Sequence, residues 1–337
     1  MLYELLLTVA VAISSAPSDQ QEVIVVVGAP GSDEYAEAFA KAAEDWQAAA
    51  AKASAACMVI GQDAHENTTD RQRLQQALKA ATTQSAEPLW LVFIGHGTFD
   101  GKVAKFNLRG PDVAAGDLQA WLDGAARPLA IIDCSSSSGP FINKLSGTNR
   151  VVVTSTKSGF QYNFSRFGKF ISAAIADPEA DLDKDQQTSL LEAFLLASSR
   201  VQEFYDQAGR LATEHALIDD NGDGRGTPAD WFRGVRTTRA AKDGAAPDGL
   251  RANQLCLIRS AREEQMPPEV RKRRDALEVD IARLRNLKPK LPEPVYYEQL
   301  EALLIELAEL YRDLPDASEP AASNAEPPAA KATKVAE

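Results

Sequence analysis

Short runs of apolar residues recur through the first half of the chain at the spacing of alternating strands and helices. The runs cover residues 23–27, 57–60, 89–94, 129–132 and 150–154. Each run is short and apolar, and most are bounded by glycine or polar residues, which is typical of strands buried on both faces of a parallel sheet. The sequence therefore predicts five parallel strands in one domain.

Amphipathic segments separate or follow these runs. Helices are predicted from about 33 to 52, at 70–81, at 117–122, at 164–176 and at 189–207. A chain that alternates strand and helix folds as an α/β domain, with right-handed crossovers and helices on both faces of the sheet. We expect this domain to occupy residues 22–248.

The pattern changes after residue 248. Over 262–314 the chain is rich in Glu, Arg and Leu, with leucines or isoleucine at helical spacing on both sides of a Lys-Pro-Lys break at 288–290. This pattern predicts an antiparallel helical hairpin within 249–314. So short an apolar seam has to pack on the main domain, on a protein partner, or on a second copy of the chain. Residues 315–337, made mostly of Ala, Pro, Glu and Lys, are predicted to be a disordered tail.

Composition narrows the class of protein. The 337 residues are 45% hydrophobic and 25% charged, with a net charge of −12. That composition fits a globular protein. So acidic a chain predicts no basic surface for binding nucleic acid or an anionic membrane. Its three scattered cysteines exclude a disulfide framework. Cys57, on a predicted strand, is expected to be a small buried hydrophobe.

The first sixteen residues resemble a secretory signal peptide. An apolar core at 5–13 is followed by the small residues Ser14, Ser15 and Ala16. Export predicts a secreted or periplasmic protein, with no membrane contact beyond the export step. The alternative is a frayed N-terminal segment, because Glu4 precedes the core and no basic residue does.

Two predicted strand ends carry the chemistry. The run at 89–94 ends in Gly95-His96-Gly97, and the run at 129–132 ends in Asp133-Cys134 followed by four serines. Because parallel strands end at the same edge of a sheet, His96 and Cys134 are expected at one edge. A thiol and an imidazole are the minimum equipment for a cysteine nucleophile and its base.

Strand–His–Gly followed by strand–Cys resembles the legumain/caspase-like (clan CD) cysteine peptidases over residues 22–234. The resemblance implies a caspase-like three-layer sandwich with a mostly parallel sheet, and a peptide or protein substrate. It also implies that His96 is the base, Cys134 the nucleophile and the Gly97 backbone N–H an oxyanion-hole donor. The segment 154–161, including Lys157, would form one wall of the specificity pocket.

The position of the nucleophile leaves two functions open. Counting from Asp133 places the family's nucleophile at Ser135, and counting back from Gly139 places it at Ser136, so Cys134 comes one or two residues early. The first hypothesis is a cysteine endopeptidase with a His96–Cys134 dyad. The alternative is a catalytically inactive pseudo-peptidase that acts as a calcium-stabilised interaction or scaffold protein.

Two acidic loops have the oxygen spacing of calcium-binding loops. Their side-chain donors fall at positions one, three, five, nine and twelve. They are Asp181, Asp183, Asp185, Ser189 and Glu192 in the first loop, and Asp219, Asn221, Asp223, Thr227 and Asp230 in the second. Position six is Gln186 in the first loop and Gly224 in the second. We expect a structural Ca²⁺; the alternative is a pair of Asx-rich turns that cap helices. His215, just before the second loop, is expected to pack at a helix end.

Overall fold

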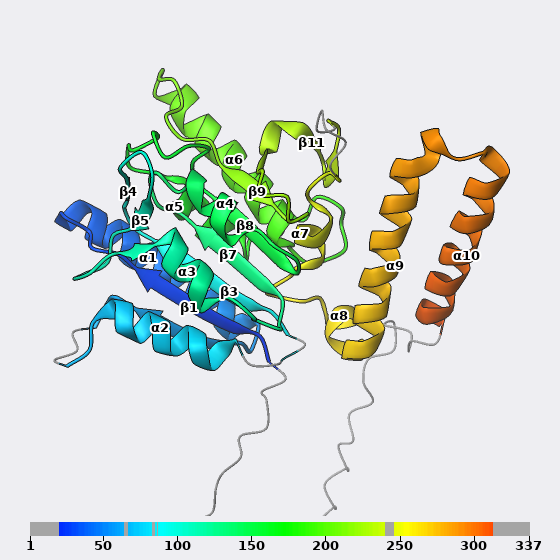
Figure 1. Cartoon of the computed structure of the whole chain (residues 1–337), viewed down its shortest axis with the longest axis horizontal. Coiled ribbons are helices and arrows are strands. Elements are labelled where there is room, and N and C mark those ends of the chain that lie inside the picture. Colours follow the sequence, from blue (N-terminus) through cyan, green and yellow to red (C-terminus); the bar gives the residue numbers. More distant parts are fainter. Residues whose placement is uncertain (1–19, 64–66, 83–84, 86, 240–245, 313–337) are drawn as a thin grey trace, which may run out of the picture. The chain divides into compact units, whose positions relative to one another are not determined.

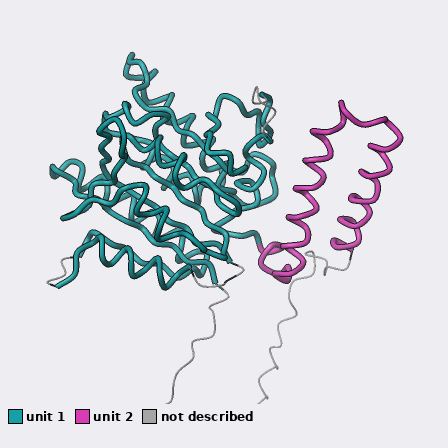
Figure 2. The backbone as a smooth tube through the Cα atoms, in the orientation of Figure 1, with its two compact units in different colours: residues 1–260 teal, residues 261–337 magenta. Residues whose placement is uncertain are grey.

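The computed structural model describes residues 20–63, 67–82, 85, 87–239 and 246–312. The signal-like segment at 1–16 and the tail at 315–337 lie outside these residues. The chain forms two compact units, Met1–Ser260 and Ala261–Glu337 (Figure 2). The sequence predicts a boundary at residue 248. The structure divides the chain twelve residues later, so residues 249–260 belong to the first unit.

A seven-stranded sheet forms the centre of the first unit. Its strand order is β10-β9-β8-β7-β3-β1-β2. The strands are β1 (Glu22–Val27), β2 (Ala56–Ile60), β3 (Leu89–Ile94), β7 (Leu129–Asp133), β8 (Arg150–Thr154), β9 (Leu217–Asp219) and β10 (Thr227–Pro228). The first five are parallel, and β9 runs antiparallel to β8 and to β10. The five predicted strands are therefore confirmed.

Helices cover both faces of this sheet (Figure 1). One face carries α1 (Asp33–Lys52), α5 (Phe167–Ala174) and α6 (Leu190–Gln207); the other carries α2 (Asp70–Ala81), α3 (Ala115–Trp121) and α4 (Gly139–Leu145). Successive strand side chains alternate between the two cores, as the pleat requires. On β3, Trp90 and Ile94 enter the first core while Leu91 and Phe93 enter the second. The expected α/β three-layer sandwich is confirmed.

Short elements connect these layers. They are β4 (Gly97–Phe99), β5 (Ala104–Phe106), β6 (Val113–Ala114), η1 (Pro178–Ala180), η2 (Ala229–Trp231), β11 (Phe232–Arg233), β12 (Arg236–Thr237) and α7 (Leu250–Gln254). The three strands β4 to β6 form a small antiparallel sheet that begins directly after His96.

One expectation about the sheet is wrong. Cys57 is exposed, as is Met58 beside it. The reason is that β2 is an edge strand, paired only with β1 among the described strands, so helices do not cover its outer residues. The apolar run at 57–60 identifies a strand but carries no information about its place in the sheet.

The second unit contains α8 (Ala261–Gln265), α9 (Pro268–Leu287), η3 (Lys288–Lys290) and α10 (Glu293–Arg312). Helices α9 and α10 run antiparallel and form the predicted hairpin (Figure 1). Leu277, Ile281 and Leu284 of α9 and Tyr296 of α10 are buried. Among the described residues, none of the helices combines the length and the apolar character needed to cross a membrane.

Candidate functional site at the carboxyl edge of the sheet

His96 is held in one orientation at the end of β3. Its Nε2 lies 3.1 Å from the carbonyl oxygen of Pro30, so Nε2–H is the donor and Nδ1 is left as the proton acceptor. The rings of Tyr35, Phe39 and Phe164 lie 4.8, 5.3 and 5.8 Å from the imidazole, between centroids. The ring is half-buried. This is the arrangement of a general base whose tautomer is fixed by a third group.

Cys134 lies farther than His96 from the carboxyl edge of the sheet, measured along the strand direction. Phe93 pairs with Asp133 across β3 and β7, and the Cys134 N–H donates to the Phe93 carbonyl at 2.9 Å. Cys134 is therefore level with Ile94, two residues before His96. At about 3.3 Å per residue, this offset is roughly 7 Å along the strand direction.

The Cys134 thiol belongs to the core. The residue is 3% exposed and packs among the apolar side chains under α5. A Cβ on Gly168 of α5 would lie 2.9 Å from the Cys134 Cβ, so the helix sits directly against the cysteine. Burial raises the pKa of the thiol well above its ordinary value, and the carboxylates of Asp133 and Glu214 raise it further. A nucleophilic cysteine has the opposite property, a lowered pKa. The His96–Cys134 dyad therefore stays a prediction that this geometry does not favour.

The serines after Cys134, in contrast, contact the residue beside His96. The Ser136 hydroxyl accepts from the Gly97 N–H and donates to the Gly97 carbonyl, each at 3.2 Å. A Cβ on Gly97 would lie 2.8 Å from the Ser135 Oγ and 2.3 Å from the Ser136 carbonyl oxygen, so only glycine fits. The N–H expected to stabilise an oxyanion is already paired with a hydroxyl.

Asp133 ends β7 inside the protein. Its Oδ1 accepts from the Ser135 N–H at 2.9 Å and from the Ser135 hydroxyl at 2.6 Å, while its Oδ2 has no hydrogen-bond partner among the described residues. Burial raises the pKa of Asp133 to about 7, although the two bonds from Ser135 oppose the rise. The Ser135 hydroxyl is thus hydrogen-bonded to a carboxyl group rather than to an imidazole.

A network of buried hydroxyl groups fixes the rest of the serine tract. Ser138 Oγ lies 3.2 Å from Ser155 Oγ and 3.1 Å from Thr156 Oγ1, and the Ser155 hydroxyl donates to the Ser135 carbonyl at 2.6 Å. These residues are all buried. Hydrogen bonds between hydroxyl and carbonyl groups therefore connect the segments that follow β7 and β8.

The segment expected to wall a specificity pocket lies beside this network. Lys157 and Phe160 are exposed, and the Gln161 amide donates to Nδ1 of His215 at 2.6 Å. Burial lowers the pKa of His215, and the positive charge of Lys157 lowers it further. His215 therefore anchors this segment through Gln161 instead of packing at a helix end as expected.

The sequence did not identify the groups that hold His96. Pro30 acts through its backbone carbonyl, which leaves no signature in residue type. Tyr35, Phe39 and Phe164 were visible only as apolar positions of predicted helices. A ring of aromatic residues around a histidine becomes recognisable only when α1 and the chain before α5 are placed against the same strand end.

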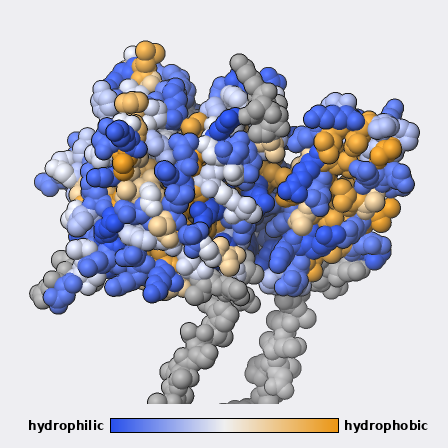
Figure 3. Space-filling view, in the orientation of Figure 1, coloured by the Kyte–Doolittle hydropathy of each residue, from blue (hydrophilic) through white to orange (hydrophobic). Residues whose placement is uncertain are grey.

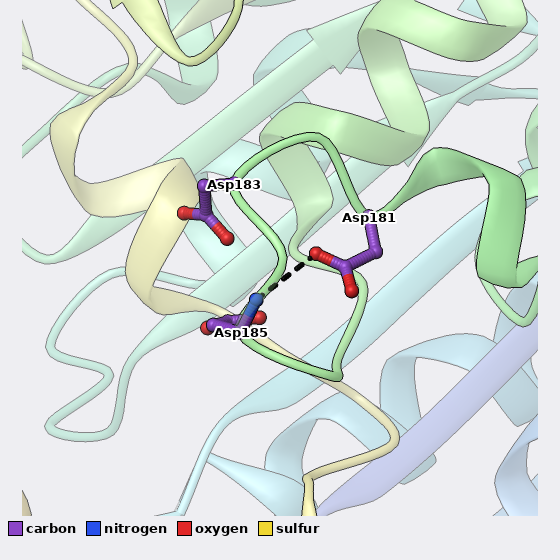
Figure 4. A group of neighbouring side chains, drawn as sticks. All are labelled: Asp181, Asp183 and Asp185. Carbon is purple, nitrogen blue, oxygen red and sulfur yellow. Dashed lines mark hydrogen bonds between the residues drawn. The ribbon is translucent and has the colours of Figure 1, made fainter.

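The first acidic loop brings three carboxylates together (Figure 4). Oxygen atoms of Asp181, Asp183 and Asp185 all lie within 4.8 Å of one another. Asp181 accepts from the backbone N–H groups of Asp185 and Gln186, at 3.2 and 3.1 Å. Burial and neighbouring carboxylates raise the pKa of Asp183 and Asp185. This set of oxygens is of the kind that Ca²⁺ binds.

Two other expected ligands of this loop, Ser189 and Glu192, bond to other groups of the loop instead of joining the three carboxylates. Ser189 and Glu192 form the capping box of α6, in which the Glu192 carboxylate accepts from the Ser189 N–H at 2.9 Å. The other Glu192 oxygen accepts from the N–H of Leu182 at 2.7 Å. Neither side chain belongs to the carboxylate group of Asp181, Asp183 and Asp185.

The second acidic loop does not assemble all its expected ligands. The Thr227 hydroxyl donates to Asp248 at 2.5 Å, and Asp230 pairs with Arg239 at 3.1 Å. Asn221 and Asp223 accept backbone N–H bonds two residues on, as in Asx turns. Asp219, buried at the loop's start, accepts from the Gly222 N–H at 3.1 Å. Within the described residues, the carboxylates of this loop form no group comparable to that of the first loop.

The site is thus a histidine at the carboxyl edge of a three-layer α/β sandwich. A solved structure of caspase-1 from Spodoptera frugiperda aligns with 9% identity and a TM-score of 0.39, over 60% of this chain and 86% of that one. The Drosophila initiator caspase Dronc aligns with 10% identity and a TM-score of 0.40, over 61% and 81%. Similarity at this level says nothing about activity. Scans of protein-family models and of curated proteins find no match.

Proposed function

We propose that this protein is a pseudo-peptidase: an interaction protein built on a caspase-like or legumain-like scaffold that has no working nucleophile. The observation that carries the proposal is the pair of hydrogen bonds between Ser136 and Gly97: the Gly97 N–H, the expected oxyanion-hole donor, donates to the Ser136 hydroxyl, which in turn donates to the Gly97 carbonyl. Its partner would be a peptide or protein. The competing hypothesis is a cysteine endopeptidase with a His96–Cys134 dyad.

Thiol catalysis needs a thiolate, a base within reach and a free oxyanion donor. Cys134 has a raised pKa and lies in the core. In the sheet it is level with Ile94 rather than with His96, and the Gly97 N–H is already paired. A separate observation opposes each requirement, and together these observations support the proposal of an inactive site.

The contacts of Ser135 also oppose a serine in place of the thiol. Ser135 occupies one of the two alternative nucleophile positions, but its hydroxyl donates to Asp133 at 2.6 Å and is fully buried. A carboxyl with a pKa of about 7 is a weak base for an alkoxide, which is much harder to generate than a thiolate. The buried serine therefore supports a structural role for this edge.

The decisive experiment measures intact-protein mass after treatment with peptidyl acyloxymethyl ketones carrying Asn, Asp, Arg or Lys before the warhead. Treatment is done with Ca²⁺ and with chelator. We expect no adduct on Cys134. An adduct that maps to Cys134 and disappears in His96→Ala would instead establish the cysteine endopeptidase and give its side-chain preference.

Cys57 supplies the control for thiol access. It is exposed, whereas Cys134 and Cys256 are buried. Iodoacetamide should therefore alkylate one thiol in the folded protein and three after denaturation, and Cys57→Ser should remove the fast site. This pattern would show that a negative result with the ketones comes from folded protein.

Two further parts of the proposal concern conditions outside the cell. The apolar segment at 5–13 supports export, and the carboxylate group of Asp181, Asp183 and Asp185 supports a structural Ca²⁺. Calcium is abundant in extracytoplasmic compartments, where even a weak site would be filled. Cleavage after residue 16, checked by N-terminal sequencing of the secreted protein, tests export.

A further inference from the structure

The second helix of the hairpin leaves most of its apolar surface open. In the twenty-residue α10, only Tyr296 is buried, whereas Tyr297, Leu304 and Ile305 are 48%, 43% and 53% exposed. Leu287, at the end of α9, is exposed as well. In Figure 3, orange residues gather over unit 2. Monomeric proteins rarely leave such a group of large apolar side chains open to water.

The width of the apolar stripe on α10 indicates more than one helical neighbour. Tyr296, Leu300, Leu303, Leu307 and Leu310 repeat at spacings of four and three, which is the seam a two-helix hairpin needs. Tyr297, Leu304 and Tyr311 form a second stripe, seven residues apart and beside the first. A helix with an apolar face this wide is typical of a bundle, in which it contacts two neighbours.

The charges of the hairpin identify what that neighbour is. Helix α10 carries five Glu against one Arg, a net charge of −4, whereas α9 carries six basic against four acidic side chains, a net charge of +2. Within the hairpin the two helices already pair, as Arg273 Nε donates to Glu306 at 2.7 Å. The best complement to the open face of an acidic, apolar α10 is therefore a basic α9, and a second copy of this chain supplies one.

We propose that the hairpin docks on the hairpin of a second copy to form a four-helix bundle, with α10 of each chain against α9 of the other. A two-fold axis satisfies both contacts at once, as in most homodimers. The dimer buries Tyr297, Leu304 and Ile305, and opposes acidic to basic helices on both sides. This inference does not depend on the catalytic status of the first unit, so the two proposals fail separately.

The first test measures the mass of the full chain by light scattering across a concentration series. Leu304→Glu with Ile305→Glu should raise the dimer dissociation constant by roughly 30-fold or more, the effect of losing a central interface contact. Circular dichroism checks that the variant keeps its helices. Leu211→Glu is the matched control, because Leu211 is 91% exposed but lies in the first unit; its dimer should be unchanged.

The second test uses charge to identify the helix pair. One variant reverses exposed acids of α10 (Glu298→Lys, Glu301→Lys, Glu309→Lys), and the other reverses bases of α9 (Lys272→Glu, Arg283→Glu, Arg285→Glu). Each variant alone opposes like charges and should be monomeric, whereas an equimolar mixture should form a heterodimer.

Several results would overturn the proposal. They are a monomeric wild-type chain at all concentrations, a dimer that survives the Leu304 and Ile305 substitutions, and charge variants that fail to pair on mixing. A monomer that binds lipid vesicles would instead assign the open face to a membrane, and that too would overturn it.

Discussion

At the scale of single residues, the site is governed by burial. Asp133 follows an apolar strand and is fully buried, so its environment favours the neutral acid. Its pKa of about 7 compares with an ordinary value near 3.8. The folded state therefore holds a proton that the unfolded chain releases between these pH values.

This difference makes the folded protein less stable as pH rises from about 4 to about 7, since the folded state binds more protons there. The three-unit shift corresponds to at most about 4 kcal/mol. Asp133→Asn keeps an oxygen for the Ser135 donors and removes the titration. Urea unfolding at pH 5 and pH 8 should show a smaller loss of stability in the variant than in the wild type.

Asp248, which also has a pKa raised to about 7 by burial, remains in both proteins, so its contribution cancels in the comparison. Equal pH dependence in wild type and Asp133→Asn would contradict the assignment.

The same residues mark the limit of prediction from sequence. The apolar run at 89–94 places His96 at a strand end, and the structure agrees. It takes the pairing of Phe93 with Asp133 to show that Cys134 is level with Ile94. Strand ends cannot be located from an apolar run to within one residue, and one residue decides which side chain meets the histidine.

At the scale of elements, the two acidic loops share left-handed backbone at two matching positions. Positions four and six have positive φ in both: Lys184 at 64° and Gln186 at 72° in the first, Gly222 at 82° and Gly224 at 76° in the second. Glutamine therefore makes the turn for which glycine was expected. In the first loop, the ligands at positions nine and twelve differ from the expectation.

That difference could not be foreseen. Ser189-x-x-Glu192 has the spacing of positions nine and twelve of a calcium loop and also that of a capping box. In the structure the capping box is formed. The sequence likewise gave no signal for β9 and β10, because strands of three and two residues are too short to show a periodicity.

Calcium binding to the first loop is the next prediction. The three carboxylates of Asp181, Asp183 and Asp185 should bind Ca²⁺ with a dissociation constant on the order of 0.1 to 1 mM, as in extracellular modules. Asp183→Asn, which removes one charge at unchanged size, should weaken binding in calorimetry. The matched control is Asp223→Asn in the second loop. A wild-type protein that shows no heat of binding at millimolar Ca²⁺ would refute the prediction.

Replacing the strained residue provides an independent check on this loop. Gln186→Gly should stabilise the protein by about 0.5 to 1 kcal/mol, because glycine adopts φ of 72° without a Cβ clash. It should also tighten Ca²⁺ binding. In Ser54→Gly, a similar left-handed position outside any acidic loop, stability should rise while calcium affinity stays constant. Equal changes of Ca²⁺ affinity in the two variants would show that the turn at Gln186 does not control the metal site.

At the scale of the whole molecule, the two compact units have separate cores, so we expect them to unfold in separate transitions. The four tryptophans, Trp46, Trp90, Trp121 and Trp231, all lie in the first unit. Tryptophan fluorescence therefore reports on that unit alone, whereas ellipticity at 222 nm also reports on the hairpin.

Because the hairpin is proposed to dimerise, mass action should raise the midpoint of its thermal transition as protein concentration rises. The fluorescence transition of the first unit should stay at one temperature over the same range. In the variant with Leu304→Glu and Ile305→Glu, the concentration dependence should disappear while the fluorescence transition remains. A single transition seen by both probes, independent of concentration, would mean that the hairpin folds as part of the first unit.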